Sequence, residues 1–182
     1  MCKGSLFLAA DAFVRKRFGA AAVDRCLAGF SAEEQLVWKS AVAVGRYPMA
    51  LLTRFLRAAD AALGKNDLAL CHDAGRFAAE YQLTLFHKFA LRFTTPHWLM
   101  DRGVRIYDGN VGSGRWQVEK VSERELIARL DGFAEPDPAL CRRWSGWIQR
   151  AAEMTGAKQC SVPETRCRLR GDPLCEYRGT WS

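Results

Sequence analysis

The hydrophobic pattern of this chain changes its period near residue 100, and this change limits the fold more than any other feature of the sequence. In the first half, apolar residues recur at the spacing of one helix face. In the second half, residues 104–107, 115–121 and 126–130 follow the pattern of short strands. Helices followed by strands predict an α+β fold, in which N-terminal helices pack on an antiparallel sheet.

Helix start and stop signals divide the first half of the chain. Ser31 begins a capping box, because its hydroxyl and the Glu34 carboxylate can each accept a hydrogen bond from the other's backbone amide. Gly19 ends the first expected helix, and Pro48 opens a later one. We expect helices over residues 5–18, 23–30, 47–63 and 67–93, and a further helix that begins after Ser31.

Turn and cap signals divide the second half in the same way. Asp108-Gly109-Asn110 is a hairpin signal that follows the first expected strand, residues 104–107. Asp137 followed by Pro138 predicts one late helix, which runs to about Thr155. We expect strands over residues 158–169 and 174–180 to complete the sheet.

The length of the chain suits one compact domain, and the sequence has no internal repeat or linker. We expect a single domain over residues 1–182, with a helical part over about 5–100 and a sheet part over about 101–182. No stretch approaches the roughly 18 consecutive apolar residues of a membrane helix, and the apolar start is too short for a signal peptide. The expected location is therefore the cytoplasm, without a membrane span.

The net charge of +7 invites a nucleic-acid interpretation, but the distribution of that charge does not favour it. The positive charge is mostly arginine spread along the whole chain, without a lysine-rich tail. We therefore expect no nucleic-acid partner.

The cysteines are the most informative polar residues. Seven cysteines without an export signal favour reduced thiols or metal ligands over a disulfide framework. Cys141, Cys160, Cys167 and Cys175 all lie within the last 42 residues. Cys167 and Cys175 stand at the two ends of an expected turn, which brings such positions together as metal ligation requires. Buried cysteines that only pack as small apolar side chains are the alternative.

Three thiolates and one carboxylate would make a closed tetrahedral set suited to Zn²⁺. Cys141 falls in the first turn of the late helix, where the helix dipole stabilises a thiolate. Glu164 precedes Cys167 by three residues, so an ideal strand would point the two side chains to opposite faces. The site therefore needs a bulge or bend there, and Cys160 is the alternative fourth ligand.

The spacing Cys-x25-Cys-x7-Cys, with Glu164 before the middle cysteine and Gly171-Asp172 before the last, resembles the 4-vinyl reductase domain family. Pro138-Ala139-Leu140-Cys141 and Gly146-Trp147 resemble that family's Pro-x-x-Cys and Gly-Trp helix. Over nearly all of its length, the chain further resembles the myxobacterial paralogous relatives of unknown function.

The resemblance implies a fold shared with haem-dependent nitric-oxide sensor domains and with the TRAPP subunits of vesicle-tethering complexes. It implies a homodimer and a structural zinc bound by Cys141, Glu164, Cys167 and Cys175. It also implies a pocket for a small apolar or aromatic ligand, bordered by Trp144, Ser145, Ile148 and Val162. His97 and Trp116 are further candidates for that pocket.

Haem is the obvious alternative cofactor, because the shared fold includes haem sensors. The Tyr-x-Ser-x-Arg signature that holds haem propionates in those sensors is absent from this sequence. The three histidines are better explained as solvated or hydrogen-bonded side chains than as iron ligands. We therefore expect haem to be unlikely.

The leading functional hypothesis is a non-enzymatic, dimeric sensory domain that binds a small molecule and passes the signal to a separate partner protein. The first alternative is a scaffolding or adaptor protein that resembles TRAPP subunits. The remote alternative is an enzyme of tetrapyrrole vinyl reduction. The sequence has no nicotinamide or flavin motif, and a zinc with four protein ligands leaves no open position for chemistry.

Overall fold

The structure is a computed structural model that describes residues 1–83 and 93–182. The N-terminal half contains β1 (Cys2–Lys3), α1 (Gly4–Phe18), α2 (Ala20–Leu27), α3 (Ala32–Lys39), β2 (Arg46–Tyr47), α4 (Met49–Leu63) and α5 (Ala69–Leu83). The C-terminal half contains α7 (Pro96–Asn110), β3 (Arg115–Ser122), β4 (Glu125–Asp131), α8 (Pro138–Met154), β5 (Glu164–Arg166), the 3₁₀ turn η2 (Arg168–Arg170) and β6 (Cys175–Thr180).

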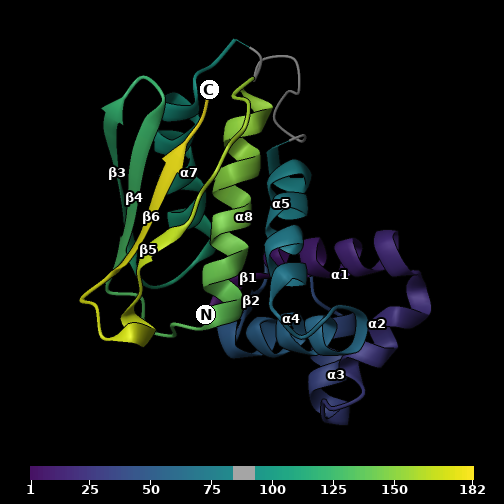
Figure 1. The fold of residues 1–182 in the computed structure, drawn as a ribbon. Coiled ribbons are helices and arrows are strands. Elements are labelled where there is room, and N and C mark those ends of the chain that lie inside the picture. The colour runs from purple at the N-terminus through teal and green to yellow at the C-terminus, as the bar shows by residue number, and fades with distance from the viewer. Residues whose placement is uncertain (84–92) are drawn as a thin grey trace.

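The long helix α8 lies at the centre of the fold. On one side it faces α7 and the four-stranded antiparallel sheet, whose strand order is β3-β4-β6-β5. On the other side it packs along α5, and α1 to α4 gather at one end of that helix pair (Figure 1). This arrangement confirms the expected α+β class, with helices packed on an antiparallel sheet.

The sequence explains why α8 forms where it does. The Asp137 side chain caps the helix by accepting a hydrogen bond from the Ala139 amide at 2.8 Å, and Pro138 supplies the first helical position. Leu140, Trp144 and Ile148 recur at helical spacing and are buried. The helix therefore presents apolar side chains to its neighbours along its whole length.

Two glycines allow α5 and α8 to cross at very short distance. A Cβ atom on Gly75 would lie 1.9 Å from the backbone oxygen of Arg143, and one on Gly146 would lie 2.0 Å from the backbone oxygen of His72. Since backbone atoms cannot turn aside as a side chain can, only glycine fits at these two positions. The pair of glycines thus sets the separation of the two central helices.

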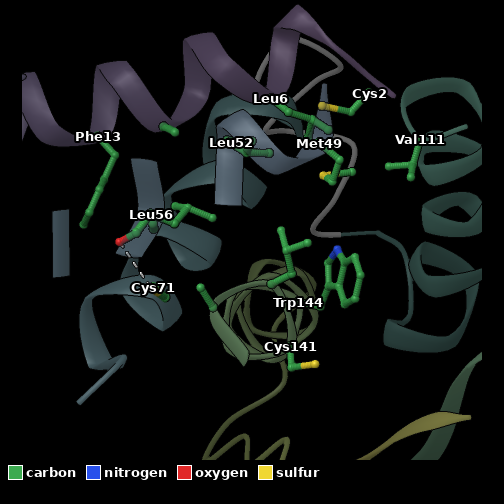
Figure 2. Close-up of a cluster of buried hydrophobic side chains, with 14 of the residues drawn as sticks. Cys2, Leu6, Phe13, Met49, Leu52, Leu56, Cys71, Val111, Cys141 and Trp144 are labelled. Atoms are coloured by element: carbon green, nitrogen blue, oxygen red, sulfur yellow. Dashed lines mark hydrogen bonds between the residues drawn. The ribbon is translucent and has the colours of Figure 1, made fainter. Parts of the chain in front are cut away.

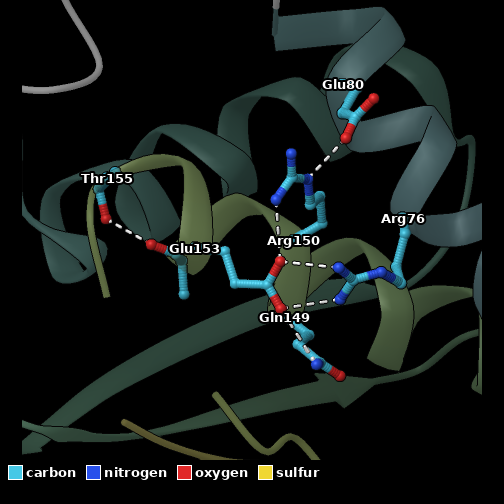
Figure 3. Close-up of polar contacts among 7 residues, drawn as sticks. Arg76, Glu80, Gln149, Arg150, Glu153 and Thr155 are labelled. Carbon is cyan, nitrogen blue, oxygen red and sulfur yellow. Dashed lines mark hydrogen bonds and ion pairs between the residues drawn. The ribbon is translucent and has the colours of Figure 1, made fainter. Parts of the chain in front are cut away.

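Ion pairs connect the same two helices nearer the end of α8. Arg76 of α5 makes a bidentate pair with Glu153, with both N···O distances at 2.8 Å. Arg150 contacts Glu80 at 2.7 Å and Glu153 at 3.0 Å, so the Glu153 carboxylate accepts from two guanidinium groups (Figure 3). The charges are partly exposed, so the network contributes more to register than to stability.

The core is continuous from the N-terminal helices to the cysteine-rich end. Phe7 and Leu52 are fully buried among the N-terminal helices, and Leu126 and Leu130 are fully buried on the sheet. Figure 2 shows Met49 and Cys2 facing the Trp144 side of α8, across which the two halves of the protein meet. Among the described residues, no helix combines the length and the apolar character that a membrane crossing needs.

The sequence prediction of a strand at residues 104–107 and a hairpin at Asp108-Gly109-Asn110 is wrong. These residues belong to α7, whose N-terminus is capped by the Thr95 hydroxyl and begins with proline. The short alternation at 104–107 is compatible with the period of a strand and with that of a helix. The Thr95 cap, fifteen residues before the helix ends at Asn110, decides for the helix. The helix period appears only when Met100, Tyr107 and Val111 are aligned on one face.

Two further expectations need correction. The expected strand over residues 158–169 is reduced to an isolated bridge at Ser161 and the three residues of β5. The helix expected over residues 67–93 begins at Ala69, because Leu68 has a left-handed φ of 64°. Residues 84–92 of that helix lie outside the described residues, and its expected end, Phe93, is in a turn. The expected capping box at Ser31 is present, and the helix expected over residues 47–63 is observed as α4, Met49–Leu63.

Candidate functional site

A cavity of about 80 Å³ lies between α7, α8 and the inner face of the sheet. This is several times the space that one water molecule needs, about 10–15 Å³. Its wall is mostly apolar, and its larger side chains come from α7 (Met100, Val104, Tyr107), from α8 (Leu140, Trp144, Ile148) and from the strands (Trp116, Val118). Leu6 and Met49 of the N-terminal helices complete the lining.

Trp116 of β3 and Trp144 of α8 line the cavity, and further aromatic rings pack behind them. The Trp144 ring meets Trp116 edge to face at 5.9 Å between centroids and Phe133 at 5.0 Å. Trp116 also packs against Tyr177 at 5.6 Å. These contacts fix the rotamers of the two tryptophans, so this wall is preformed rather than collapsed.

Most polar groups on the cavity wall already have partners. The Tyr107 hydroxyl donates to the Ser113 carbonyl at 2.7 Å, and burial raises its pKa well above the usual range. Asn110 accepts a hydrogen bond from Ser5 at 2.8 Å, and Gln82 accepts one from the Trp147 indole at 2.9 Å. These groups are held by the protein itself.

Arg143 is the exception on this wall. The residue is only 4% exposed, and its Nη2 atom has no hydrogen-bond partner within the described part of the chain. Burial lowers the pKa of its guanidinium to about 10, so the group still carries its charge at neutral pH. A buried, charged nitrogen without a partner is unusual and requires an explanation.

The residues that the sequence assigned to a pocket divide into three groups. Trp116, Trp144 and Ile148 line the cavity. Ser145 and Val162 are buried but do not line it. The Ser145 hydroxyl donates to the Val162 carbonyl and ties α8 to the segment before β5. His97 lies elsewhere, with its Nε2 3.2 Å from the Glu125 carbonyl oxygen and its ring beside Trp181.

Sequence reasoning did not select Arg143 as a cavity residue. The available signal was its position on α8, three residues after Leu140 and four before Trp147, which places it on an otherwise apolar helix face.

The second candidate site is a cluster of metal-ligating side chains at the N-terminal end of α8. One donor atom from each of Cys141, Glu164, Cys167 and Cys175 lies within 4.8 Å of every other donor. The Sγ atoms of Cys141 and Cys167 are 4.0 Å apart. A tetrahedron with arms of about 2.3 Å has edges of about 3.8 Å, so a small contraction brings these atoms to one ion.

Local structure accounts for this convergence. The register of β5 against β6 shifts between Glu164 and Arg166, which supplies the irregularity that Glu164 needs to share a side with Cys167. The chain then folds back through η2 and Gly171, whose φ of 90° suits glycine. Asp172 fastens this loop by accepting a hydrogen bond from the Cys167 amide at 2.8 Å.

The electrostatics of the cluster reflect the gathering of acidic groups. A hydrogen bond shared with Cys175 raises the pKa of the Cys141 thiol, and burial and the Glu164 charge raise it further. The same hydrogen bond lowers the pKa of Cys175 to about 6. Tyr177 is fully buried beside the cluster, and its hydroxyl lies 3.4 Å from Glu164.

Cys160, the alternative fourth ligand, is not part of the cluster among the described residues. It is partly exposed and lies in the segment that bridges to Thr180 through Ser161. Glu164 therefore occupies the fourth position in the arrangement seen here.

Comparisons with known proteins identify the fold. No family model and no curated protein matches the chain, so the sequence comparisons lend no support to membership of the 4-vinyl reductase family or to its myxobacterial branch. Solved structures do match over its full length. The fold is that of H-NOX domains.

Three of these structures illustrate the likeness. An H-NOX protein from S. oneidensis in the Fe(II)NO state has a TM-score of 0.75 and 14% identity, with 99% of each chain covered. The Fe(II) unliganded H-NOX protein from K. algicida has a TM-score of 0.69 and 13% identity, covering 99% of this chain and 96% of that one. The H-NOX domain from Shewanella oneidensis in the Fe(II)CO state has a TM-score of 0.73 and 14% identity, covering 99% and 98%.

The expectation that haem is unlikely is wrong, because the structural neighbours of the chain are iron-containing H-NOX domains. The expected cofactor set must be corrected accordingly, and zinc is suggested only by the cysteine cluster. Two cavity side chains are of types that serve haem elsewhere, Met100 as an iron ligand and Arg143 as a cation for a carboxylate, whereas the Tyr107 hydroxyl already donates to the Ser113 carbonyl. His72 and His97 do not line it, and His87 lies outside the described residues.

Proposed function

We propose that this protein is a non-enzymatic, cytoplasmic sensory domain that binds a small molecule in the cavity between α7, α8 and the sheet. The observation that carries the proposal is the cavity itself, an apolar space with a preformed aromatic wall inside an H-NOX fold. Concave, mostly apolar sites with a few polar groups are the usual form of ligand pockets.

The fold supplies a route from ligand to surface. α7 and α8 both contribute to the cavity wall and contact each other, and α8 also contacts α5. A ligand that binds one spacing of α7 and α8 more tightly shifts the population toward that spacing. In this proposal the shift is transmitted through a homodimer to a separate signalling protein.

We further propose that the cluster of Cys141, Glu164, Cys167 and Cys175 holds a thiophilic divalent metal ion. The chemistry of the donors supports this, because soft thiolates bind such ions and a cation relieves the mutual repulsion of four acidic groups. An ion there would join the first turn of α8 to β5 and β6. Its role is structural, since the four protein donors leave no position for a substrate.

Haem belongs among the ligands to be tested, as the Fe(II) states of the structural neighbours indicate. If the protein binds haem, the Arg143 guanidinium on the cavity wall is the group that would pair with a propionate. Haem supplies an iron centre for diatomic gases, and the Soret absorbance of a hemin titration reports its binding directly.

The proposed function is tested by filling the cavity. Ala128 lies on the cavity wall and is 1% exposed, so Ala128→Leu adds three carbon atoms to that space. We expect indole to bind the wild type and Ala128→Ser, which changes the volume little, and to bind Ala128→Leu at least about tenfold more weakly. Hemin is titrated into the same three proteins. A scaffolding protein would show no binding and no difference between the variants.

A further inference from the structure

Arg143 places a guanidinium group at the wall of an otherwise apolar cavity. The Arg143 side chain lines the cavity, and the residue as a whole is only 4% exposed. In the described ranges, its Nη2 is the one buried side-chain nitrogen or oxygen atom that lacks a hydrogen-bond partner. The other polar side chains named on the wall, Tyr107, Asn110 and Gln82, donate to or accept from protein groups.

The charge of Arg143 also lacks an acidic counterpart in the described chain. The groups that favour its charged form are the thiols of Cys2 and Cys71. Burial raises their pKa values to about 11 and about 12, so both thiols are neutral at pH 7 and do not balance the charge. Residues 84–92 contain no Asp or Glu, so that segment has no carboxylate to offer either.

An isolated buried cation destabilises a folded protein unless something pairs with it. The guanidinium presents its donors in a fixed planar fork, which matches the two oxygens of a carboxylate. The remaining wall is apolar and aromatic, and the free volume of about 80 Å³ admits a small organic group. The cavity thus combines one anion-binding group with an apolar surround.

We propose that the cavity binds a small apolar carboxylic acid whose carboxylate pairs with the Arg143 guanidinium. This inference rests on the proposed function and names the chemical class of its ligand. The apolar part of the acid, aromatic or aliphatic, packs against Trp116, Trp144 and Ile148. The ligand therefore completes the pairing that the chain alone leaves open.

The test compares a matched pair of probes, phenylacetate and phenylacetamide, which differ in charge and hardly in shape. Calorimetric titration of the wild type is expected to show phenylacetate binding at least about tenfold more tightly, because hydrogen bonds between charged groups are the stronger ones. In Arg143→Met, which keeps the length of the side chain and removes the charge, this preference is expected to fall to about one. Arg143→Lys keeps the charge without the fork and is expected to retain part of the preference.

A stability measurement separates ligand binding from a structural role. Without added ligand, Arg143→Met is expected to melt at the same temperature as the wild type or higher, since the variant buries no unpaired charge. A lower melting temperature of Arg143→Met would show that the guanidinium serves the folded protein itself and would overturn the inference.

The remaining outcomes are distinguishable. Equal binding of acid and amide to wild type and Arg143→Met would overturn the carboxylate inference and leave a small-molecule domain standing. Binding of neither probe, nor of indole or hemin, would overturn both proposals. Arg143-dependent binding of hemin alone would assign the guanidinium to a haem propionate and overturn the small-acid inference.

Discussion

The crossing of α5 and α8 provides the sharpest test of the packing, and Gly146→Ala is the perturbation. The added Cβ would lie 2.0 Å from the His72 backbone oxygen, far inside the contact distance of a carbon and an oxygen. Because the obstacle is backbone, no rotamer change relieves the overlap. The two helices must separate, and α8 carries both the cavity wall and Cys141.

The expected magnitude follows from two opposing effects. Forcing extra atoms into a packed interior destabilises a protein by about 1–3 kcal/mol, and a backbone obstacle favours the upper end of that range. Alanine gains up to about 1 kcal/mol over glycine in a helix interior. The net loss in the free energy of unfolding is therefore about 2 kcal/mol, which lowers the melting temperature of a chain of this size by about 4–8 °C.

Thermal and urea unfolding followed by circular dichroism measure this loss, with Gly109→Ala as the matched control. Gly109 also lies in a helix, but a Cβ there would meet nothing within 4 Å. The control is expected to be neutral or to gain stability through helix propensity. If Gly146→Ala, like Gly109→Ala, has a melting temperature equal to or above that of the wild type, the close crossing of α5 and α8 is refuted.

Three further predictions address other parts of the structure. Asp60 is fully buried and its carboxylate accepts hydrogen bonds from two backbone amides after α4, so Asp60→Ala should lower the free energy of unfolding by about 2–4 kcal/mol in urea titrations. Cys167→Ser should abolish metal retention in elemental analysis and lower the melting temperature, as chelation of the wild type should, whereas Cys160→Ser should change neither. Burial alone would raise the pKa of Glu153, but hydrogen bonds from Arg76 and a second arginine lower it. The ionised carboxylate therefore stabilises the fold above its unfolded-state pKa, and this contribution is lost as the pH falls through the lower folded-state pKa. Glu153→Gln should flatten the acid side of a plot of the free energy of unfolding against pH.

The sequence was most informative where the determinants of structure are local. The capping box at Ser31 and the Asp137-Pro138 helix start depend on residues within one turn, and both are present in the structure. The α7 region was misread because residues 104–107 are too few to separate a helix period from a strand period. There the helix is decided by a cap far upstream and by packing against α8 and β3.

The candidate sites show the same division. Cys141, Glu164, Cys167 and Cys175 could be selected from their spacing, although the register shift that turns Glu164 toward the cysteines comes from pairing with β6. The missing partner of Arg143 could not be predicted, because it is a property of everything that packs around the side chain. An unpaired buried charge becomes visible only when all its neighbours are placed.

Native mass spectrometry of the protein purified without a tag, compared with its mass after denaturation, shows whether the cavity holds a ligand. We expect each chain to retain one small organic molecule that is lost on denaturation and is absent from Ala128→Leu. The same spectrum gives the oligomeric state and any bound metal. A wild-type chain that carries no organic mass, and takes up none when phenylacetate, indole and hemin are added, would contradict the claim that this fold encloses a ligand site.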